Sequence, residues 1–176
     1  ARDANDASTL GPTEEVDLVG LAAEECARTG ADLEIAPGGS SLLVQGHPRL
    51  LRRLLRNLLE NARRYGRPVS GADADPGEPQ VRLTLSQRSG SGSRASTTGA
   101  SGVAVLWVDD RGPGVPTELQ ARIFEPFYRL PGASEKEGGV GLGLSLVKSI
   151  AERHRGLVRC ESRPGGGARF VVELPL

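Results

Sequence analysis

The segment from Pro48 to Tyr65 restricts the fold of this chain more than any other. It reads PRLLRRLLRNLLENARRY, and at about 100° per residue its leucines fall on one broad face, with arginine and glutamate opposite. Proline in the first turn and Gly66 just past the end are typical helix boundaries. A helix with so wide an apolar face must pack against a second layer, which the rest of the chain has to supply.

Other segments with regular patterns provide that layer. We expect helices at EEVDLVGLAAEECARTG, with Asp17 as N-cap and Gly30 as stop, at GLSLVKSIAERH, and for a short piece of PTELQARIFEPFYR. Apolar patterns predict strands at ADLEIAP, SLLVQG, VRLTLSQ and GVAVLWVDD, and a closing hairpin in GLVRCESRPGGGARFVVELPL. This mixed order favours an α/β fold, a two-layer sandwich with helices on one face of a mixed sheet. The unbroken apolar run GVAVLWVDD predicts a strand covered on both faces.

Length and charge narrow the class of protein. The 176 residues suit one domain over 14–176 after a flexible linker remnant at 1–13, with a flexible Gly/Ser-rich hairpin connection at 88–102. Lys plus Arg and Asp plus Glu are 22 each, so no basic field points to nucleic acid or an anionic membrane. No apolar run approaches the roughly 20 residues that span a bilayer, which predicts a soluble chain without membrane contact. We expect Cys26 and Cys160, which lack metal-ligand spacing, to be buried free thiols in a reducing compartment.

Two asparagines and an arginine lie along the border of the leucine-rich helix. Asn57, Asn61 and Arg64 are spaced i, i+4 and i+7, so they form one row between the apolar and the charged face. Asparagine is a mediocre helix former and adds nothing to a packed core, so the row points to a ligand that needs amide oxygens. Taken alone, the two asparagines favour an ordinary solvated helix edge over a ligand site.

A carboxylate stands at the end of the most apolar strand. In WVDDRGPGVP the strand ends at Asp109 and Asp110 and breaks at Gly112 and Gly114. A strand-end carboxylate beside backbone with little side-chain bulk can accept a hydrogen bond from a ligand amine while the chain passes close to the ligand. A tight turn with an Asx cap would give the same letters.

Glycines also open the helix at GLSLVKSIAERH. In EGGVGLGLSL the glycines include Gly139, Gly141 and Gly143. The free N–H groups and positive end of a helix favour phosphate, and glycine lets phosphate approach the backbone. The spacing matches neither a dinucleotide fingerprint nor a P-loop.

In this order, the three segments resemble the N, G1 and G2 boxes of the catalytic ATP-binding domain of bacterial two-component sensor histidine kinases. IFEPFYR, which contains Phe124 and Phe127, resembles the F box of that family. The resemblance runs over residues 14–176. It implies the Bergerat-type (GHKL) α/β sandwich with a flexible ATP lid, ATP and Mg²⁺ as cofactors, and transfer of the ATP γ-phosphoryl group to a histidine.

The resemblance also implies residue roles. Asn61 matches the asparagine that ligates Mg²⁺, while Asn57 and Arg64 match residues near the metal and phosphates, and these three form the implied catalytic set. Asp110 matches the carboxylate that accepts the adenine amino group. The implied nucleotide-binding set further contains Tyr65 beside the adenine, Gly112 and Gly114 beneath it, Gly139, Gly141, Gly143 and Leu144 at the triphosphate, and Phe124 and Phe127, which pin a lid over 115–138.

The sequence contains no match to the family's phosphoacceptor box, a histidine followed by an acidic residue. Its only histidines are His47, interpreted as a surface position at a helix start, and His154, interpreted as a cation at a helix C-terminus. The resemblance therefore implies a catalytic fragment. Its partners would be its own upstream dimerisation and phosphoacceptor domain and a cognate response regulator, with a homodimer only in the full-length protein. The implied location is cytoplasmic, as part of a membrane-anchored sensor.

Three alternatives share parts of this pattern. Related ATPases of the gyrase B, MutL and HSP90 type activate water with a glutamate where this chain has Asn57, and Glu60 lies one helical step away toward solvent. An anti-sigma-type protein-serine kinase would use a separate acceptor protein. A degenerate module would bind nucleotide without catalysis.

Overall fold

The computed structural model describes residues 11–65, 80–89, 102–128 and 143–176. The start of the expected linker, most of the Gly/Ser-rich stretch and the later part of the expected lid, with Gly139 and Gly141, lie outside the described residues. The elements follow in the order β1 (Glu14–Asp17), α2 (Leu18–Thr29), β2 (Asp32–Ile35), β3 (Leu43–Gly46), α3 (Pro48–Tyr65), β4 (Arg82–Ser89), β5 (Gly102–Asp109), the 3-10 turns η1 (Thr117–Leu119) and η2 (Arg122–Phe124), α4 (Gly143–Arg153), β6 (Leu157–Ser162) and β7 (Ala168–Pro175).

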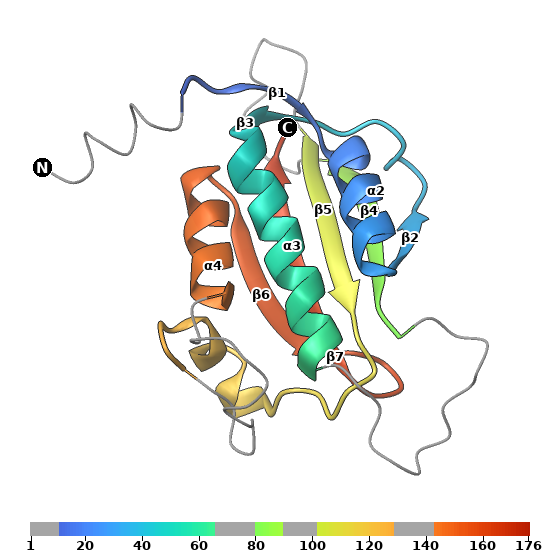
Figure 1. The fold of residues 1–176 in the computed structure, drawn as a ribbon, viewed down its shortest axis with the longest axis vertical. Coiled ribbons are helices and arrows are strands. Elements are labelled where there is room, and N and C mark those ends of the chain that lie inside the picture. The colour runs from blue at the N-terminus through green and yellow to red at the C-terminus, as the bar shows by residue number, and fades with distance from the viewer. Residues whose placement is uncertain (1–10, 66–79, 90–101, 129–142) are drawn as a thin grey trace, which may run out of the picture.

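Among the described residues, five strands form one mixed sheet, and α2, α3 and α4 cover one of its faces (Figure 1). The strand order is β2-β4-β5-β7-β6, with β2 parallel to β4 and the other neighbouring pairs antiparallel. β1 and β3 form a separate antiparallel pair. The arrangement confirms the predicted two-layer α/β sandwich with helices on one face, and it places the predicted closing hairpin at β6 and β7.

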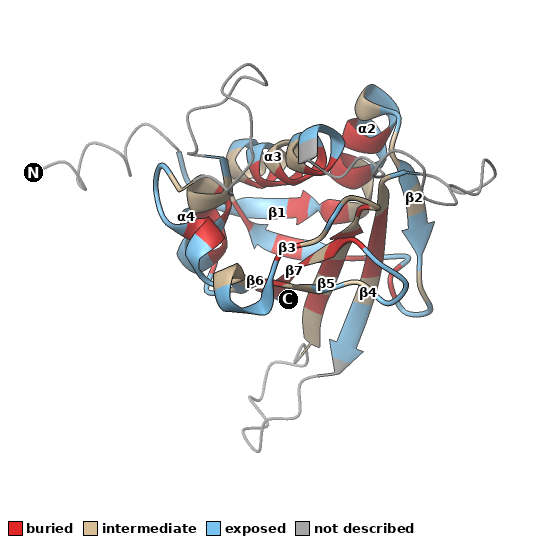
Figure 2. Ribbon diagram, turned by 90° about the horizontal axis from the view of Figure 1, so that it is seen from below, coloured by how far each residue is buried: buried red, intermediate tan, exposed pale blue. Residues whose placement is uncertain are grey.

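The core lies between the helices and the sheet (Figure 2). The predicted leucine face of α3 is buried, and it meets the inward side chains of β4, β5 and β7. Fully burying a leucine stabilises a fold by roughly 1.5–3 kcal/mol, so this row fixes α3 across the middle of the sheet. The fully buried leucines of this core include Leu51, Leu54, Leu55, Leu58, Leu83, Leu85, Leu106 and Leu174.

The strand β5 is covered on one face only, so the prediction of two covered faces was wrong. Its buried residues alternate, at Ala104, Leu106 and Val108, whereas the intervening residues are partly exposed. The described helices all pack on the face of the sheet that carries these buried residues. Long side chains of the sheet itself shield the opposite, open face. The guanidinium of Arg169, for example, lies 5.7 Å from the centre of the Trp107 ring.

Local signals set the ends of α2 as predicted. The Asp17 carboxylate accepts the N–H of Gly20 at 3.2 Å, and Gly30 ends the helix with a left-handed φ of 78°. The short strand β1, which precedes this cap, has no counterpart in the sequence-based prediction. It pairs with β3, so β2 and β3 lie in different sheets although they are neighbours in the chain.

A buried ion-pair group joins α2 to α3. The Glu25 side chain is 1% exposed and accepts hydrogen bonds from Arg52 at 3.2 Å and from Arg56 at 3.1 and 3.2 Å. Burial acts to raise the pKa of Glu25, but the hydrogen bonds from Arg56 and Arg52 outweigh it and hold the pKa below its usual range. The carboxylate is therefore ionised at neutral pH and holds the two helices in register.

Both cysteines are buried free thiols, as predicted. Burial raises the pKa of Cys26 to about 11 and that of Cys160 to about 12. Both thiols are therefore protonated at neutral pH and act as small core residues.

Candidate functional site

The carboxylate of Asp110 lies directly after β5 and is 5% exposed. Its Oδ1 accepts two backbone N–H groups at 3.0 Å, one from Gly112 in the following turn and one from Ala168 at the start of β7. The Asp110 N–H donates in turn to the Ala168 carbonyl at 3.0 Å. Burial raises the pKa of Asp110, and the two backbone hydrogen bonds partly oppose that rise.

This carboxylate keeps one oxygen for a ligand. Within the part of the chain that the structure describes, both hydrogen bonds to Asp110 are accepted by Oδ1, which leaves Oδ2 as an acceptor. A buried acceptor held in place by backbone donors is suited to one directed hydrogen bond from a ligand N–H. Asp110 therefore has the geometry that its predicted role requires.

Two glycines bring separate backbone segments together at Asp110. Gly114 has a left-handed φ of 78°, and a Cβ on it would lie 3.2 Å from the carbonyl oxygen of Gly167. A Cβ on Gly167, whose φ is 94°, would overlap the carbonyl oxygen of Asp110. The turn between β6 and β7 is thus part of this site, although the sequence-based reading of its PGGG letters gave only a hairpin turn.

The row of side chains on α3 faces the start of α4. The side-chain amide of Asn57 donates to the carbonyl oxygen of Gly143 at 3.4 Å, which joins two of the predicted motifs across 86 residues of chain. Asn61 is partly buried and makes no hydrogen bond to the described residues, so its amide oxygen is available. Arg64 is exposed one turn further along, and Tyr65 ends the helix, with its side chain outside the described part.

All these segments lie at one end of the molecule. Figure 1 shows the end of α3, the end of β5 and the start of α4 together at the lower edge of the view. Leu144, one residue into α4, is partly buried against the core. The structure therefore brings the row on α3, Asp110 with its glycine turn, and the first turn of α4 to a common end of the sandwich.

Only one of the two predicted lid anchors is packed. Phe124 is buried and meets Phe170 edge to face, with ring centroids 6.3 Å apart. Phe127 is 69% exposed and has an unusual φ of 63°. Of the two rings, only Phe124 is packed among the described residues, and the implied role of Phe127 toward the lid stays a prediction.

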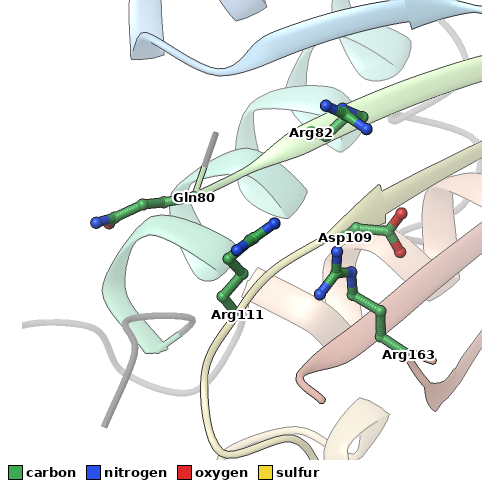
Figure 3. A pocket seen from close by; sticks show the side chains of 5 residues that line it. All are labelled: Gln80, Arg82, Asp109, Arg111 and Arg163. Carbon is green, nitrogen blue, oxygen red and sulfur yellow. The ribbon is translucent and has the colours of Figure 1, made fainter. Parts of the chain in front are cut away.

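A separate hollow lies beside this end of the sheet (Figure 3). It is lined by Gln80, Arg82, Asp109, Arg111 and Arg163. Side chains alternate along a strand, so Asp109 points away from the side on which Asp110 lies. The Asp109 carboxylate pairs with Arg169 through contacts of 2.6 and 3.2 Å. Asp109 is thus part of the charged open face of the sheet, and its charge acts to raise the pKa of Asp110.

The ring of His154 is buried and held by hydrogen bonds on both of its nitrogens. His154 is 8% exposed, its Nε2 accepts the backbone N–H of His47 at 3.0 Å, and its Nδ1 lies 2.8 Å from the carbonyl oxygen of Ile150. Because Nε2 accepts, Nδ1 must carry the proton that reaches Ile150. Burial lowers the pKa of His154. The residue is therefore neutral, and its interpretation as a cation at the helix end was wrong.

No cluster of three or more His, Cys, Asp or Glu side chains among the described residues is arranged to hold a metal ion. None of the helices within the described ranges combines the length and apolarity needed to cross a bilayer.

The fold and the order of these motifs match a known class of ATP-binding domain. Residues 46–176 match the family described as histidine kinase-, DNA gyrase B-, and HSP90-like ATPase, and the chain belongs to that family. Within it, the similar proteins identify the chain as a catalytic domain of the sensor histidine kinase type.

The similar proteins include two Escherichia coli K12 sensors. The sensor protein RstB is 41% identical over 140 residues, which cover 76% of this chain and 27% of RstB. The sensor histidine kinase CpxA is 33% identical over 156 residues, covering 88% of this chain and 29% of CpxA. The chain thus spans less than a third of the length of either sensor.

Solved structures agree with these similarities. The ATP-binding domain of PrrB from Mycobacterium tuberculosis is 29% identical, with a TM-score of 0.61, and the match covers 94% of this chain and 98% of that domain. The mycobacterial sensor histidine kinase MprB shares the fold with a TM-score of 0.65 at 23% identity, over 93% of this chain and 97% of that one.

Proposed function

We propose that this domain binds Mg-ATP between the end of α3, the end of β5 and the start of α4, and transfers the γ-phosphoryl group to a histidine of a separate helical domain. The observation that carries the proposal is the Asp110 carboxylate, with Oδ1 held by two backbone N–H groups and Oδ2 open. The contact between Asn57 and Gly143 supports it, because it joins the amide row to the start of α4.

Each side chain then has a defined task. Asp110 accepts the adenine amino group through Oδ2, and Gly112 and Gly114 let the backbone pass beneath the base. The first turn of α4, from Gly143, presents N–H groups and a positive helix end to the phosphates. Arg64 supplies positive charge near the transferred group, where phosphoryl transfer depends on positioning and charge neutralisation.

The donor groups fit magnesium. Mg²⁺ prefers oxygen ligands and commonly takes one or two from the protein, the others coming from phosphates and water. Asn61 offers an amide oxygen that makes no hydrogen bond to the described residues, at a partly buried position. Magnesium bound there would supply charge neutralisation on the phosphates, while Asn57 holds the start of α4 beside it.

The acceptor and the partners lie outside this domain in the proposal. Neither His47 nor His154 is an acceptor, because His154 is buried with both ring nitrogens engaged and His47 stands beside it. The phosphoryl group would pass to the parent protein's dimerisation domain and then to a response regulator, as the similarity to sensor proteins indicates. We propose a cytoplasmic location on the same grounds.

The test supplies the purified chain with radiolabelled Mg-ATP and the separate histidine-bearing domain of its own parent. Acid-labile, base-stable phosphate on that domain is the expected product. Phosphoserine would favour a serine kinase instead, and steady release of inorganic phosphate would favour an ATPase. The last outcome is not expected, because Glu60 is exposed on α3 and Asn57 stands where hydrolytic relatives carry glutamate.

A further inference from the structure

The ring of His154 is fixed by shape as well as by hydrogen bonds. A Cβ on Gly46 would overlap its Cδ2 and Nε2 atoms, so the end of β3 admits the ring only because residue 46 is glycine. The His47 ring meets it edge-on, with centroids 5.7 Å apart and an interplanar angle of 80°.

Besides the buried residues Val147, Ile150 and Ala151, hydrogen bonds at both ends tie α4 to α3 and to the turn before it. At the start of α4, Asn57 donates to the Gly143 carbonyl, and at its end the His47 N–H donates to His154. The helix has 11 residues, which corresponds to about 16 Å at a rise of 1.5 Å per residue. Figure 1 shows the two helices side by side over this length. Because a short helix moves as a rigid body, release of one end displaces the other.

We propose that neutral His154 is a positioning residue for the nucleotide site, and that protonation of its ring releases the end of α4 and weakens Mg-ATP binding at the start of that helix. The inference rests on the proposed function, in which the start of α4 holds the phosphates. A protonated ring cannot accept from His47, because both of its nitrogens then carry hydrogen.

The surroundings of the ring favour its neutral form. Burial lowers the pKa of His154, the charges of His47 and Arg153 lower it further, and the Ile150 carbonyl partly opposes them. On β3, the ring meets the uncharged Gly46. No salt bridge within the described ranges joins His154 to a carboxylate.

The direction of the pH effect follows from that lowered pKa. A histidine with a depressed pKa gives its full stabilisation above the ordinary value of about 6.5. Below that value, a His154 ring that has left its contact with His47 takes up a proton more readily than a ring that is still buried in it. Falling pH therefore favours the form without the contact. Nucleotide affinity should therefore fall on acidification.

The experiment compares variants of the whole chain by calorimetric titration with Mg-ATP from neutral pH to about pH 5.5. His154→Gln keeps an acceptor for the His47 N–H but does not titrate. Protonation of ATP changes the Kd of both proteins equally, so the ratio of wild-type to variant Kd reports only the effect of His154. We expect that ratio to rise about fivefold over this range, a modest coupling between sites. His47→Ala keeps the backbone N–H but removes a neighbouring charge that lowers the pKa of His154, so the His154 ring should protonate at a higher pH than in the wild type.

A second measurement, by NMR without nucleotide, separates failure of this inference from failure of the proposed function. Ring ¹⁵N signals report the protonation of His154, and amide exchange at His47 reports the contact itself. We expect exchange at His47 to accelerate as the His154 ring protonates. A ring that titrates without change at His47, or a Kd ratio that stays constant across the pH range, would overturn the inference. Failure of the wild type to bind Mg-ATP at any pH would refute the proposed function instead, and the exchange experiment would still test the contact.

Discussion

Replacing Asp110 by Asn changes a single atom at the proposed adenine contact. The N–H groups of Gly112 and Ala168 both converge on Oδ1, each at 3.0 Å. Only an oxygen can accept from two N–H groups, so the amide oxygen of the new side chain must take that position. Its NH₂ group then occupies the place of Oδ2 and presents a donor where the adenine amino group needs an acceptor.

The expected loss follows from the lost hydrogen bond. A hydrogen bond to a charged group contributes about 1.5–3 kcal/mol, which corresponds to roughly 10- to 150-fold weaker binding of ATP. Inosine triphosphate carries an oxygen at the same position of the base, so Asp110→Asn should favour it over ATP relative to the wild type. The fold should be retained, because burial raises the pKa of Asp110 and the ionised carboxylate costs stability as the pH rises through that pKa.

The assay is calorimetric titration of both nucleotides into both proteins at neutral pH, with Tm measured in parallel. Asp109→Asn is the matched control, since its side chain pairs with Arg169 on the other side of the strand and should leave ATP affinity within about twofold. If Asp110→Asn binds ATP as tightly as the wild type, or if Asp109→Asn weakens ATP equally, the adenine assignment is refuted.

Three further changes address the metal, the ion pair and the aromatic anchor. Asn61→Ala should weaken nucleotide binding mainly when Mg²⁺ is present, and titrations that show equal losses with and without the metal would contradict its role as a ligand. Glu25→Gln should lower the free energy of unfolding by about 1–3 kcal/mol at neutral pH. Because the pKa of Glu25 is held low, that difference should shrink in urea unfolding as the pH falls below about 4.3, and a constant difference would mean that the charge does not stabilise. Phe124→Ala should lower the free energy of unfolding by about 3–5 kcal/mol, whereas Phe127→Ala, at an exposed position, should change it by no more than about 0.5 kcal/mol. Similar losses for both variants in thermal unfolding would refute the idea that Phe124 alone anchors this segment.

Features set by short-range physics were predictable from the sequence. The cap at Asp17 and the stop at Gly30 depend on a few neighbouring backbone groups, so their residue types identify them. The leucine face of α3 follows from helical periodicity alone. The strand-end position of Asp110 followed from the abrupt change from an apolar run to glycine and proline.

Features that depend on distant segments were not predictable. An apolar run such as β5 looks the same whether one face is covered or two, because the coverage depends on where the helices pack. The neutral state of His154 depends on the His47 backbone, 107 residues away in sequence. In the same way, Ala168 supplies a donor to Asp110 from a turn that local signals identify only as a hairpin.

The place of β7 in the sheet has a consequence for synthesis. It comes after every other described element in the chain, yet it lies between β5 and β6 in the strand order. During synthesis, β6 is made before the strand that joins it to the rest of the sheet. Until then β5 and β6 both present unpaired edges, and the acid after β5 lacks one of its two amide partners. A ribosome-bound intermediate of this domain should therefore be unable to capture nucleotide until translation has passed the final strand.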